Sequence, residues 1–480
     1  MRLSELLKGI DIIKTTADLN MEISGICYDS RKAKQGNIFV AVVGYESDGH
    51  NYINSAVSLG AGCVLCEKEP EADIPYILIE NTRRGLAVVS ANWFDNPASK
   101  MKMIGVTGTN GKTTTTNLIK TMLEEVFKCK VGLIGTNCNM IGDVVMEAER
   151  TTPESYEIQA LFAEMVNAGC EYVVMEVSSH ALYLDRVAGI EFEIGIFSNL
   201  TRDHLDFHKT MEEYGRAKAL LFRQSRIGIV NLDDEYCGLM TENATAKIFT
   251  YSIDKTEADL SAKNVVLKPD GISFAALMTA RLEKVKLAIP GQFSVYNGLT
   301  ALAALVNLGV DLRDAAQALS RCQGVKGRVE VVPTNSDFTV IIDYAHTPDA
   351  LENVLNTVNG FATGRVVVLV GCGGDRDKTK RPVMGKTAVD MADFAIITSD
   401  NPRTEEPMAI IEDILEGVKG TKTPYKVIEN RREAIGWAIK NHKPDDIIIL
   451  AGKGHETYQI IGKTKNHFDE REVVREFLEN

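Results

Sequence analysis

The stretch that decides the fold is residues 103–114, which read MIGVTGTNGKTT. An apolar run, Met103 to Val106, predicts a buried strand, and a turn rich in Gly and Thr follows it. The apolar residues after the turn recur at helical spacing: Leu118, Ile119, Met122, Leu123, Val126 and Phe127. A strand, a Gly-rich turn and a helix in this order open a parallel α/β unit.

The turn has the composition of a phosphate-binding loop, and its residues are Gly108, Thr109, Asn110, Gly111, Lys112, Thr113 and Thr114. Glycines let backbone N–H groups turn toward phosphate, Lys112 adds a point charge, and the Thr113 hydroxyl can hold Mg²⁺. The strict G-x-x-x-x-G-K-[ST] spacing would need Gly at position 106, where the chain has Val. We interpret the turn as a variant phosphate loop; the alternative is an ordinary helix cap.

Composition bounds the remaining possibilities. The chain has 480 residues, a net charge of −13 and 45% hydrophobic residues, which is typical of a globular protein of about three domains. The negative charge disfavours nonspecific nucleic-acid binding. No apolar run reaches about 18 residues, so no membrane span is expected. The start lacks a signal-peptide pattern, and the nine scattered Cys favour a reducing cytoplasm. The Cys63-x-x-Cys66 pair has no partner pair nearby, which disfavours zinc.

Two boundaries divide the chain. A linker at 95–100 and a Gly-rich stretch at 324–328 predict domains at 1–98, 99–327 and 328–480. In the last domain, apolar runs alternate with helical stretches, which predicts a second parallel sheet; the runs are 338–342, 365–370, 394–398 and 447–450. Ligands bind beyond the carboxyl ends of such strands. The segments there are polar, charged or Gly-rich: 343–346, 371–376, 399–403 and 451–456.

Three further residues carry potential chemistry. Glu176 ends a buried strand, where a carboxylate is costly unless a cation or hydrogen bonds compensate it. Mg²⁺ at the phosphate loop could supply that cation; a hydrogen-bonded core Glu is the alternative. His204 follows another strand and, taken alone, indicates a packed or surface histidine. Lys218 lies on an expected helix and, taken alone, indicates a solvated lysine.

Together these segments resemble the Mur ligases. The matching motifs, in family order, are GTNGKTT, EVSSHAL, SNLTRDHLDFH, YGRAK, YNGLTALAA, KGRVE, DYAHTPDAL, GCGGDRDKTKRPVMG, DNPR and AGKGHE. GTNGKT alone would equally indicate folylpolyglutamate synthases. Residues 29–31 and 44–49 also resemble the N-terminal nucleotide-sugar domain of the branch that adds the third residue of the peptidoglycan stem peptide.

The resemblance implies a fold and a reaction. The fold would be α/β with three domains: an N-terminal nucleotide-sugar domain, a central P-loop ATPase domain with a parallel sheet, and a C-terminal Rossmann-like domain. The reaction would be ADP-forming amide ligation through an acyl phosphate. The implied catalytic residues are Lys112, Lys218, His204, Arg328 and His346. The implied ATP contacts are the loop 108–114, Asn297, Arg328 and Asp343.

The resemblance also implies the cofactors. One Mg²⁺ would be held by Thr113 and Glu176. A second would be held by His204 and Lys218, the latter carbamylated with CO₂, which turns a repelled ammonium into an anion.

The implied substrates are small molecules: ATP, UDP-N-acetylmuramoyl-L-alanyl-D-glutamate and meso-2,6-diaminopimelate. The UDP substrate would meet Ser30, Thr151, Thr152, Ser178 and Arg186. Without the family, Arg186 could equally be a surface arginine. Diaminopimelate would meet Arg376, Asp400, Asn401, Pro402, Arg403, Gly452 and Glu456. Arg403 favours diaminopimelate over lysine, because a guanidinium grips a second carboxylate with two hydrogen bonds.

Several alternatives stay open at this point. They are a ligase of the same fold that uses L-lysine or another amino acid, a folylpolyglutamate synthase-like ligase, a nucleotide-binding protein without turnover, and a P-loop kinase. We further expect a cytoplasmic monomer.

Overall fold

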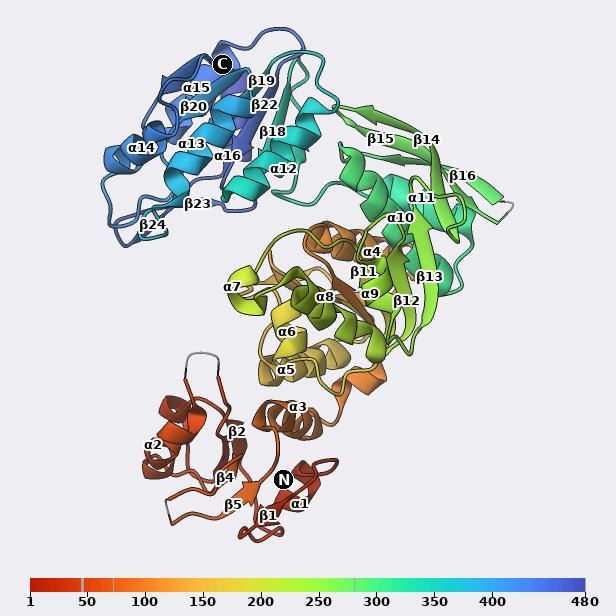
Figure 1. The fold of residues 1–480 in the computed structure, drawn as a ribbon, viewed down its shortest axis with the longest axis vertical. Helices are drawn as coiled ribbons and strands as arrows, with labels where there is room; N and C mark the ends of the chain where they lie inside the picture. Colours follow the sequence, from red (N-terminus) through yellow and green to blue (C-terminus); the bar gives the residue numbers. More distant parts are fainter. Residues whose placement is uncertain (45–46, 72, 280, 480) are drawn as a thin grey trace. The chain divides into compact units, whose positions relative to one another are not determined.

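The computed structural model describes residues 1–44, 47–71, 73–279 and 281–479. Its chain forms two compact units, Met1–Asp259 with Ala303–Val310, and Leu260–Leu302 with Asp311–Asn480 (Figure 1). Among the described helices, none combines the length and the apolar character needed to cross a bilayer.

The first unit begins with a five-stranded sheet in the order β1-β5-β4-β3-β2, in which β2 to β5 run parallel. Its elements are α1 Leu3–Leu6, β1 Lys14–Thr15, β2 Gly25–Cys27, η1 Ser30–Lys32, β3 Asn37–Val40, η2 Gly49–Tyr52, α2 Ile53–Ser58, β4 Cys63–Cys66, β5 Tyr76–Leu78, α3 Thr82–Trp93 and η3 Pro97–Lys100. Side chains of β3 alternate between two apolar clusters, with Ile38 in one and Phe39 in the other, so both faces of the sheet are buried.

The second sheet of this unit contains the phosphate loop. Its parallel strands follow the order β13-β12-β11-β6-β10-β7, and the antiparallel pair β8-β9 extends β7. Its elements are β6 Lys102–Thr107, α4 Lys112–Phe127, β7 Lys130–Ile134, β8 Asn139–Ile141, β9 Val144–Met146, α5 Ser155–Asn167, β10 Cys170–Glu176, α6 Ser179–Tyr183, β11 Phe192–Phe197, α7 Leu205–His208, α8 Met211–Ala219, η4 Leu220–Arg223, β12 Ser225–Asn231, α9 Cys237–Thr241 and β13 Lys247–Ser252.

The strand, turn and helix predicted from residues 103–127 are confirmed as β6 and α4. Leu118, Ile119, Met122 and Leu123 are buried as the spacing predicted. Phe127 is exposed, because it closes the last turn of α4, and its ring stacks on Tyr172 at 5.3 Å.

The second unit combines an antiparallel meander with a six-stranded sheet in the order β17-β18-β22-β19-β20-β21. Its elements are β14 Leu260–Lys268, β15 Gly271–Met278, β16 Arg281–Leu287, α10 Gln292–Asn307, α11 Leu312–Arg321, β17 Glu330–Val332, β18 Thr339–Asp343, α12 Pro348–Asn359, β19 Val366–Val370, α13 Lys380–Met391, β20 Phe394–Ile397, α14 Pro407–Glu416, β21 Tyr425–Val427, α15 Arg431–Lys440, β22 Ile447–Ala451, β23 Tyr458–Ile461, β24 Thr464–His467 and α16 Glu470–Glu479.

The four strands predicted for the C-terminal region are confirmed as β18, β19, β20 and β22, which run parallel. The prediction missed the two edge strands, the antiparallel β17 and the parallel β21, each of which is only three residues long. Helices α12, α13 and α14 pack on one face of this sheet, and α15 and α16 on the other (Figure 1). The carboxyl ends of the four strands therefore place the predicted polar segments along one edge.

Candidate active site

The phosphate loop lies between β6 and α4, and its conformation requires glycine at two positions. Gly108 has φ +149°, and a Cβ there would lie 1.9 Å from Ser198 Oγ. Gly111 caps α4 with φ +85°. The loop is held by the end of the neighbouring strand β11, because the backbone N–H groups of Thr109 and Asn110 donate to Asn199. The turn therefore has the glycine-dependent conformation that the phosphate-loop interpretation requires, and phosphate binding itself stays a prediction.

Two lysine ammonium groups meet at one carbonyl of this loop. Lys112 Nζ donates to the carbonyl oxygens of Gly108 and Thr109, each at 2.9 Å. Lys218 Nζ, from α8, donates to the same Gly108 oxygen at 2.9 Å. Lys218 is 1% exposed, so its solvated-lysine interpretation is wrong. Burial, with the nearby Lys112 ammonium, lowers the pKa of Lys218 well below its ordinary value.

His204 and Lys218 both lie against Tyr214. The Lys218 ammonium is 4.4 Å from the centre of the Tyr214 ring, and the His204 ring centre is 6.0 Å from it. His204 is about half exposed, and its imidazole lies 3.5 Å from the carboxylate of Asp203. The two residues that the family resemblance assigned to a second metal ion therefore lie against the same tyrosine ring, and their shared binding of a metal stays a prediction.

Glu176 is buried at the end of β10, next to β6. Its Oε1 accepts a hydrogen bond from the backbone N–H of Thr136 at 2.9 Å, and its Oε2 accepts one from the Thr136 hydroxyl at 2.9 Å. These bonds offset part of the cost of burying the carboxylate. Across residues 1–44, 47–71, 73–279 and 281–479, no three His, Cys, Asp or Glu side chains gather as a metal-binding set.

Four of the five residues predicted to meet the UDP substrate, all except Ser30, form one network around Thr152. Its hydroxyl donates to the Glu176 carbonyl at 2.8 Å and accepts from the Ser178 backbone N–H at 3.1 Å. Its carbonyl accepts from Arg186 Nη1 at 3.1 Å. The Thr151 hydroxyl joins the same network through Thr136, at 3.0 Å. Hydrogen bonds therefore connect Thr151, Thr152 and Ser178 to the end of β10, where Glu176 lies.

Arg186 is a partly buried component of this network and not an isolated surface arginine. Its side chain is 14% exposed, and its Nη2 pairs with Glu154 Oε1 at 2.8 Å. The same carboxylate accepts from Arg150 at 3.0 Å and lies 3.9 Å from Arg83. The sequence did not indicate this cluster, since Arg83 comes from α3 and the other three residues from segments 67 or more positions later in the chain.

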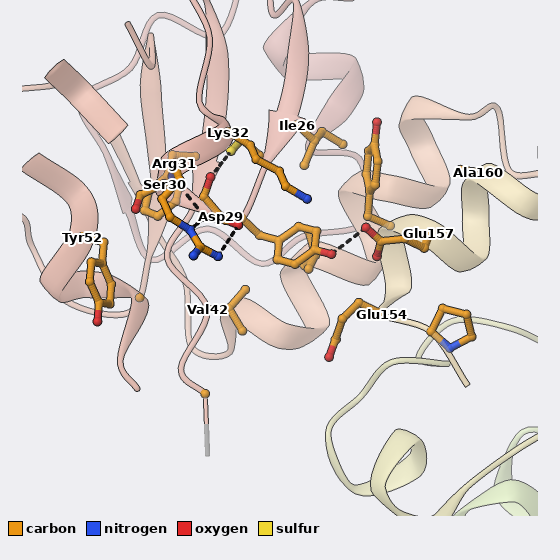
Figure 2. Close-up of a pocket in the computed structure, with 18 of the residues that line it drawn as sticks. Ile26, Asp29, Ser30, Arg31, Lys32, Val42, Tyr52, Glu154, Glu157 and Ala160 are labelled. Carbon is orange, nitrogen blue, oxygen red and sulfur yellow. Dashed lines mark hydrogen bonds and ion pairs between the residues drawn. The ribbon is translucent and has the colours of Figure 1, made fainter. Parts of the chain in front are cut away.

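A pocket of about 1390 Å³ opens in the first unit and includes Ser30 among its lining residues. Figure 2 shows Ser30 and Arg31 on one side and Glu154 and Glu157 on the other. Arg31 pairs with Asp29 at 2.8 Å. Residues 45 and 46 of the predicted 44–49 motif lie outside the described residues; Gly44, Ser47 and Gly49 line the pocket.

In the second unit, Arg328 and Asp343 meet around Tyr344. The Arg328 guanidinium lies 5.3 Å from the Tyr344 ring centre. Burial raises the pKa of Asp343, and the Arg328 charge opposes that rise. The His346 ring lies 4.6 Å from the Tyr344 ring. Asn297 is buried on α10 of the same unit. The predicted ATP contacts of these four residues stay predictions.

The segments predicted to bind diaminopimelate converge. Asn401 Nδ2 donates to Glu456 Oε2 at 2.9 Å. Lys453, fully buried, donates to that oxygen and to Asn401 Oδ1, each at 3.1 Å. A Cβ on Gly452 would lie 2.7 Å from Asp400 Oδ2, so glycine is required for this approach. Pro402 is also buried in this loop.

The two arginines of this region flank one glycine. Arg403 Nη1 donates to the Gly374 carbonyl at 2.8 Å. A Cβ on Gly373 would lie 2.9 Å from Arg403 Nη1 and 3.9 Å from Arg376 Cγ. Arg376 is exposed and Arg403 half-buried. The Arg403 guanidinium and the aliphatic stem of Arg376 therefore lie beside the same loop at the carboxyl edge of the sheet.

Sequence reasoning missed Arg381, Lys453 and Thr136 as parts of these sites. Arg381 and Lys453 stand inside the motifs GCGGDRDKTKRPVMG and AGKGHE, so the signal was present, but their ion pairs depend on tertiary packing. Thr136 carries no motif and lies 40 residues from Glu176, so sequence alone could not have indicated it.

Comparisons with known proteins identify the family of this chain. Three family models match: Mur ligase family, catalytic domain, at residues 22–102; Mur ligase middle domain, at 106–305; and Mur ligase, glutamate ligase domain, at 327–454. The chain belongs to the Mur ligase family.

Individual relatives align along the whole chain. It is 48% identical to UDP-N-acetylmuramoyl-L-alanyl-D-glutamate–2,6-diaminopimelate ligase 1 of Clostridium acetobutylicum, over 100% of this chain and 99% of that protein. It is 49% identical to UDP-N-acetylmuramoyl-L-alanyl-D-glutamate–2,6-diaminopimelate ligase of Clostridium tetani, over 100% of this chain and 99% of that protein. A solved structure of a UDP-N-acetylmuramoyl-L-alanyl-D-glutamate–2,6-diaminopimelate ligase is 32% identical, with a TM-score of 0.75 and coverage of 100% and 99%. The three-domain α/β fold expected from the resemblance is confirmed. The predicted boundaries stay predictions.

Proposed function

We propose that this chain is an ATP-dependent ligase that joins 2,6-diaminopimelate to UDP-N-acetylmuramoyl-L-alanyl-D-glutamate, a step of peptidoglycan precursor synthesis. Relatives named for this reaction align with the chain from end to end. The observation that supports ligase chemistry most directly is the meeting of Lys112 and Lys218 at the Gly108 carbonyl. Lys112 supplies a cation for the anionic phosphates, and Lys218, held beside it, is the group proposed below to become an anion that binds Mg²⁺.

The reaction proposed has two steps. The substrate carboxylate, at the γ position of D-glutamate by family analogy, attacks the γ-phosphorus of ATP, which yields an acyl phosphate and ADP. The amine of meso-diaminopimelate then attacks the acyl carbon, phosphate leaves, and a proton leaves the nitrogen. The first step is needed because a carboxylate is a poor electrophile at neutral pH. Residues 108–114 would hold the phosphates, with Lys112 stabilising the charge on the transferred group.

The residues around the loop fit Mg²⁺. Thr113 and Glu176 offer the hard oxygen donors that this ion prefers, and both lie at the carboxyl edge of the sheet. When bound, Mg²⁺ would neutralise the phosphate oxygens. Thr136 would keep Glu176 oriented through its two hydrogen bonds.

Lys218 fits carbamylation by CO₂. The reaction needs a neutral amine, and burial beside Lys112 lowers the pKa of Lys218 in that direction. The product carries a negative charge, which would replace the repulsion of Lys112 by attraction. With His204 on the same Tyr214 ring, the carbamate would supply the donors for a second Mg²⁺.

The UDP substrate would bind in the pocket of the first unit. Ser30 would contact the uridine end. Thr151, Thr152, Ser178 and Arg186 would meet the muramoyl-peptide part, which brings the substrate carboxylate next to the Glu176 strand through the Thr152 network.

Diaminopimelate would bind at the loops of the second unit. Arg376 and Arg403 would grip its distal carboxylate, since guanidinium groups match carboxylates with paired hydrogen bonds. Asn401 would serve the same carboxylate, Asp400 and Pro402 would support that part of the site, and Gly452 and Glu456 would face the distal amino-acid end. We further propose that Asn297, Arg328, Asp343 and His346 contact ATP and that the enzyme acts as a cytoplasmic monomer.

The test is product formation by the purified full chain with MgATP. ADP and phosphate release should require the UDP substrate and diaminopimelate together. Hydroxylamine added without the amine should trap the acyl phosphate as a hydroxamate. ATP binding without turnover would indicate a nucleotide-binding protein, and a stable phosphorylated product would indicate a kinase; either result would contradict the proposal.

A further inference from the structure

A buried arginine lies behind the loops proposed to bind diaminopimelate. Arg381, in the first turn of α13, is fully buried. Its Nη2 and Nη1 donate to Oε1 and Oε2 of Glu405 at 2.8 and 3.0 Å, and Nη1 also donates to Asp413 at 2.9 Å. Desolvation and the positive end of the helix both disfavour a cation at this position. The two carboxylates offset that cost.

The pair connects the two loops that follow β19 and β20. Arg381 Nη2 donates to the Gly373 carbonyl at 3.3 Å, in the first loop. Glu405, in the second loop, accepts the backbone N–H of Asp375 at 2.7 Å. The Asp375 carboxylate in turn accepts the Thr404 hydroxyl at 2.7 Å. The relative position of the two loops therefore depends on the Arg381–Glu405 pair.

Both arginines proposed to grip the substrate stand on these loops. Arg376 and Arg403 flank Gly373, whose carbonyl Arg381 holds. Arg403 also donates to the carbonyl of Gly374, one residue on. A shift of this backbone would move the two guanidinium groups relative to each other. Bidentate recognition is sensitive to such a shift, since a misplacement of about 1 Å can cost roughly 10²-fold in rate.

We propose that Arg381 and Glu405 are positioning residues for amino-acid selection: the buried pair sets the separation of Arg376 and Arg403, and so the grip on the second carboxylate of diaminopimelate. This inference rests on the proposed function. Neither residue needs to touch the substrate.

The experiment compares steady-state kinetics of the full-length Arg381→Met and Glu405→Gln variants with wild type, varying each substrate in turn. A purely structural role would reduce the active fraction, which lowers kcat and leaves every KM unchanged. The positioning role should raise the KM for meso-diaminopimelate by about 10-fold or more in Arg381→Met. Glu405→Gln should show a smaller rise, and the KM values for ATP and the UDP substrate should stay constant in both.

A matched control is Arg365→Met. Arg365 pairs with Asp446 at 2.6 Å just before β19, whereas Gly373 lies beyond the other end of the same strand. This variant loses an ion pair of the same sheet, and its KM for diaminopimelate should stay at the wild-type value.

The inference is overturned if Arg381→Met and Glu405→Gln keep the wild-type KM for diaminopimelate, or if Arg365→Met raises it equally. If Arg381→Met does not fold, Glu405→Gln decides alone. Failure of the wild-type enzyme to use diaminopimelate would instead contradict the proposed function, so the two failures are distinguishable.

Discussion

The phosphate loop and the loops proposed to bind diaminopimelate differ in the charged groups that surround their lysine and arginine side chains. At the phosphate loop, Lys112 and Lys218 donate to one carbonyl oxygen, and like charge helps to lower the pKa of Lys218. At the other loops, each fully buried cation has a carboxylate partner: Arg381 has Glu405, and Lys453 has Glu456.

The difference separates two tasks. The repulsion between the two lysines is relieved when Lys218 is converted to the proposed carbamate anion. The first region therefore suits Mg²⁺ and phosphate binding. Cations already paired with carboxylates gain less from a new anion, but their geometry is fixed before the substrate binds. We infer that the first region supplies catalytic electrostatics and the second supplies selection.

The largest expected effect is at Lys218. Lys218→Ala should lower kcat by at least about 10²-fold, because it removes the carbamate proposed to hold Mg²⁺ beside the phosphates. Small carboxylic acids that enter the space should restore part of the activity. The control is Arg216→Ala on the same helix, whose exposed side chain pairs with Glu212. A fully active Lys218→Ala enzyme would contradict the proposed role.

Arg403 tests the selection region. Arg403→Ala should raise the KM for diaminopimelate by roughly 10- to 100-fold, the range expected when charge-assisted hydrogen bonds worth about 1.5–3 kcal/mol are lost. The KM for the UDP substrate should stay nearly unchanged. Wild-type diaminopimelate kinetics in this variant would show that the guanidinium does not contact the substrate.

Replacing a buried basic residue by methionine should lower the stability of the folded chain at the loops of the second unit, but not at the phosphate loop. Arg381→Met leaves Glu405 and Asp413 without their buried partner and should lower the free energy of unfolding by about 3 kcal/mol. Lys218→Met removes a buried ammonium that Lys112 repels, so it should unfold at a temperature no lower than wild type. Thermal unfolding in bicarbonate-free buffer measures both. A comparable loss of stability in Lys218→Met would contradict the contrast.

The smallest expected effect is the pH dependence of stability that arises from His455. It tests whether neighbouring positive charges also lower the pKa of a basic side chain in the second unit. Burial, with Arg328, Arg471 and Lys326 nearby, lowers the pKa of His455 from 6.5 to about 4. Between these values the unfolded chain binds more protons than the folded one. Stability should therefore fall as pH drops from 6.5 to 4, by at most about 1.4 kcal/mol per pH unit from this residue.

The matched variant is His455→Phe. In the wild-type structure the centres of the His455 and Tyr344 rings are 4.7 Å apart, and phenylalanine keeps a ring at this position but cannot ionise. Its free energy of unfolding, measured by denaturant titration at several pH values, should fall less steeply in this window. An unchanged slope would show that His455 is not protonated on unfolding.

Local patterns in the sequence predicted much of this molecule. The phosphate loop follows from Gly108, Gly111 and Lys112, since neighbouring residues determine a strand, a turn and a helix. The strands of the C-terminal sheet were likewise predicted from continuous apolar runs. Short edge strands such as β17 were missed, because three half-exposed residues carry little periodicity.

Contacts between distant segments could not be predicted. Lys218 alone indicates a solvated helix lysine, and only the fold places it against Gly108, 110 residues earlier. The burial of Arg381 follows from the packing of α13, and the Glu154 cluster needs α3 and α5 side by side. The resemblance to the family motifs predicted functional roles for some of these residues. It did not predict the hydrogen-bond and ion-pair partners that hold their side chains in place.

The central claim is that the loops of the second unit select an amine donor with a second carboxylate. The most direct measurement gives the wild-type enzyme MgATP and UDP-N-acetylmuramoyl-L-alanyl-D-glutamate with meso-diaminopimelate, L-lysine or L-ornithine, and compares kcat/KM for amide formation. Diaminopimelate should exceed the other two by at least about 10²-fold, as expected when a site built to hydrogen-bond a substrate group meets an analogue that lacks it. Equal or faster turnover of L-lysine would contradict the account.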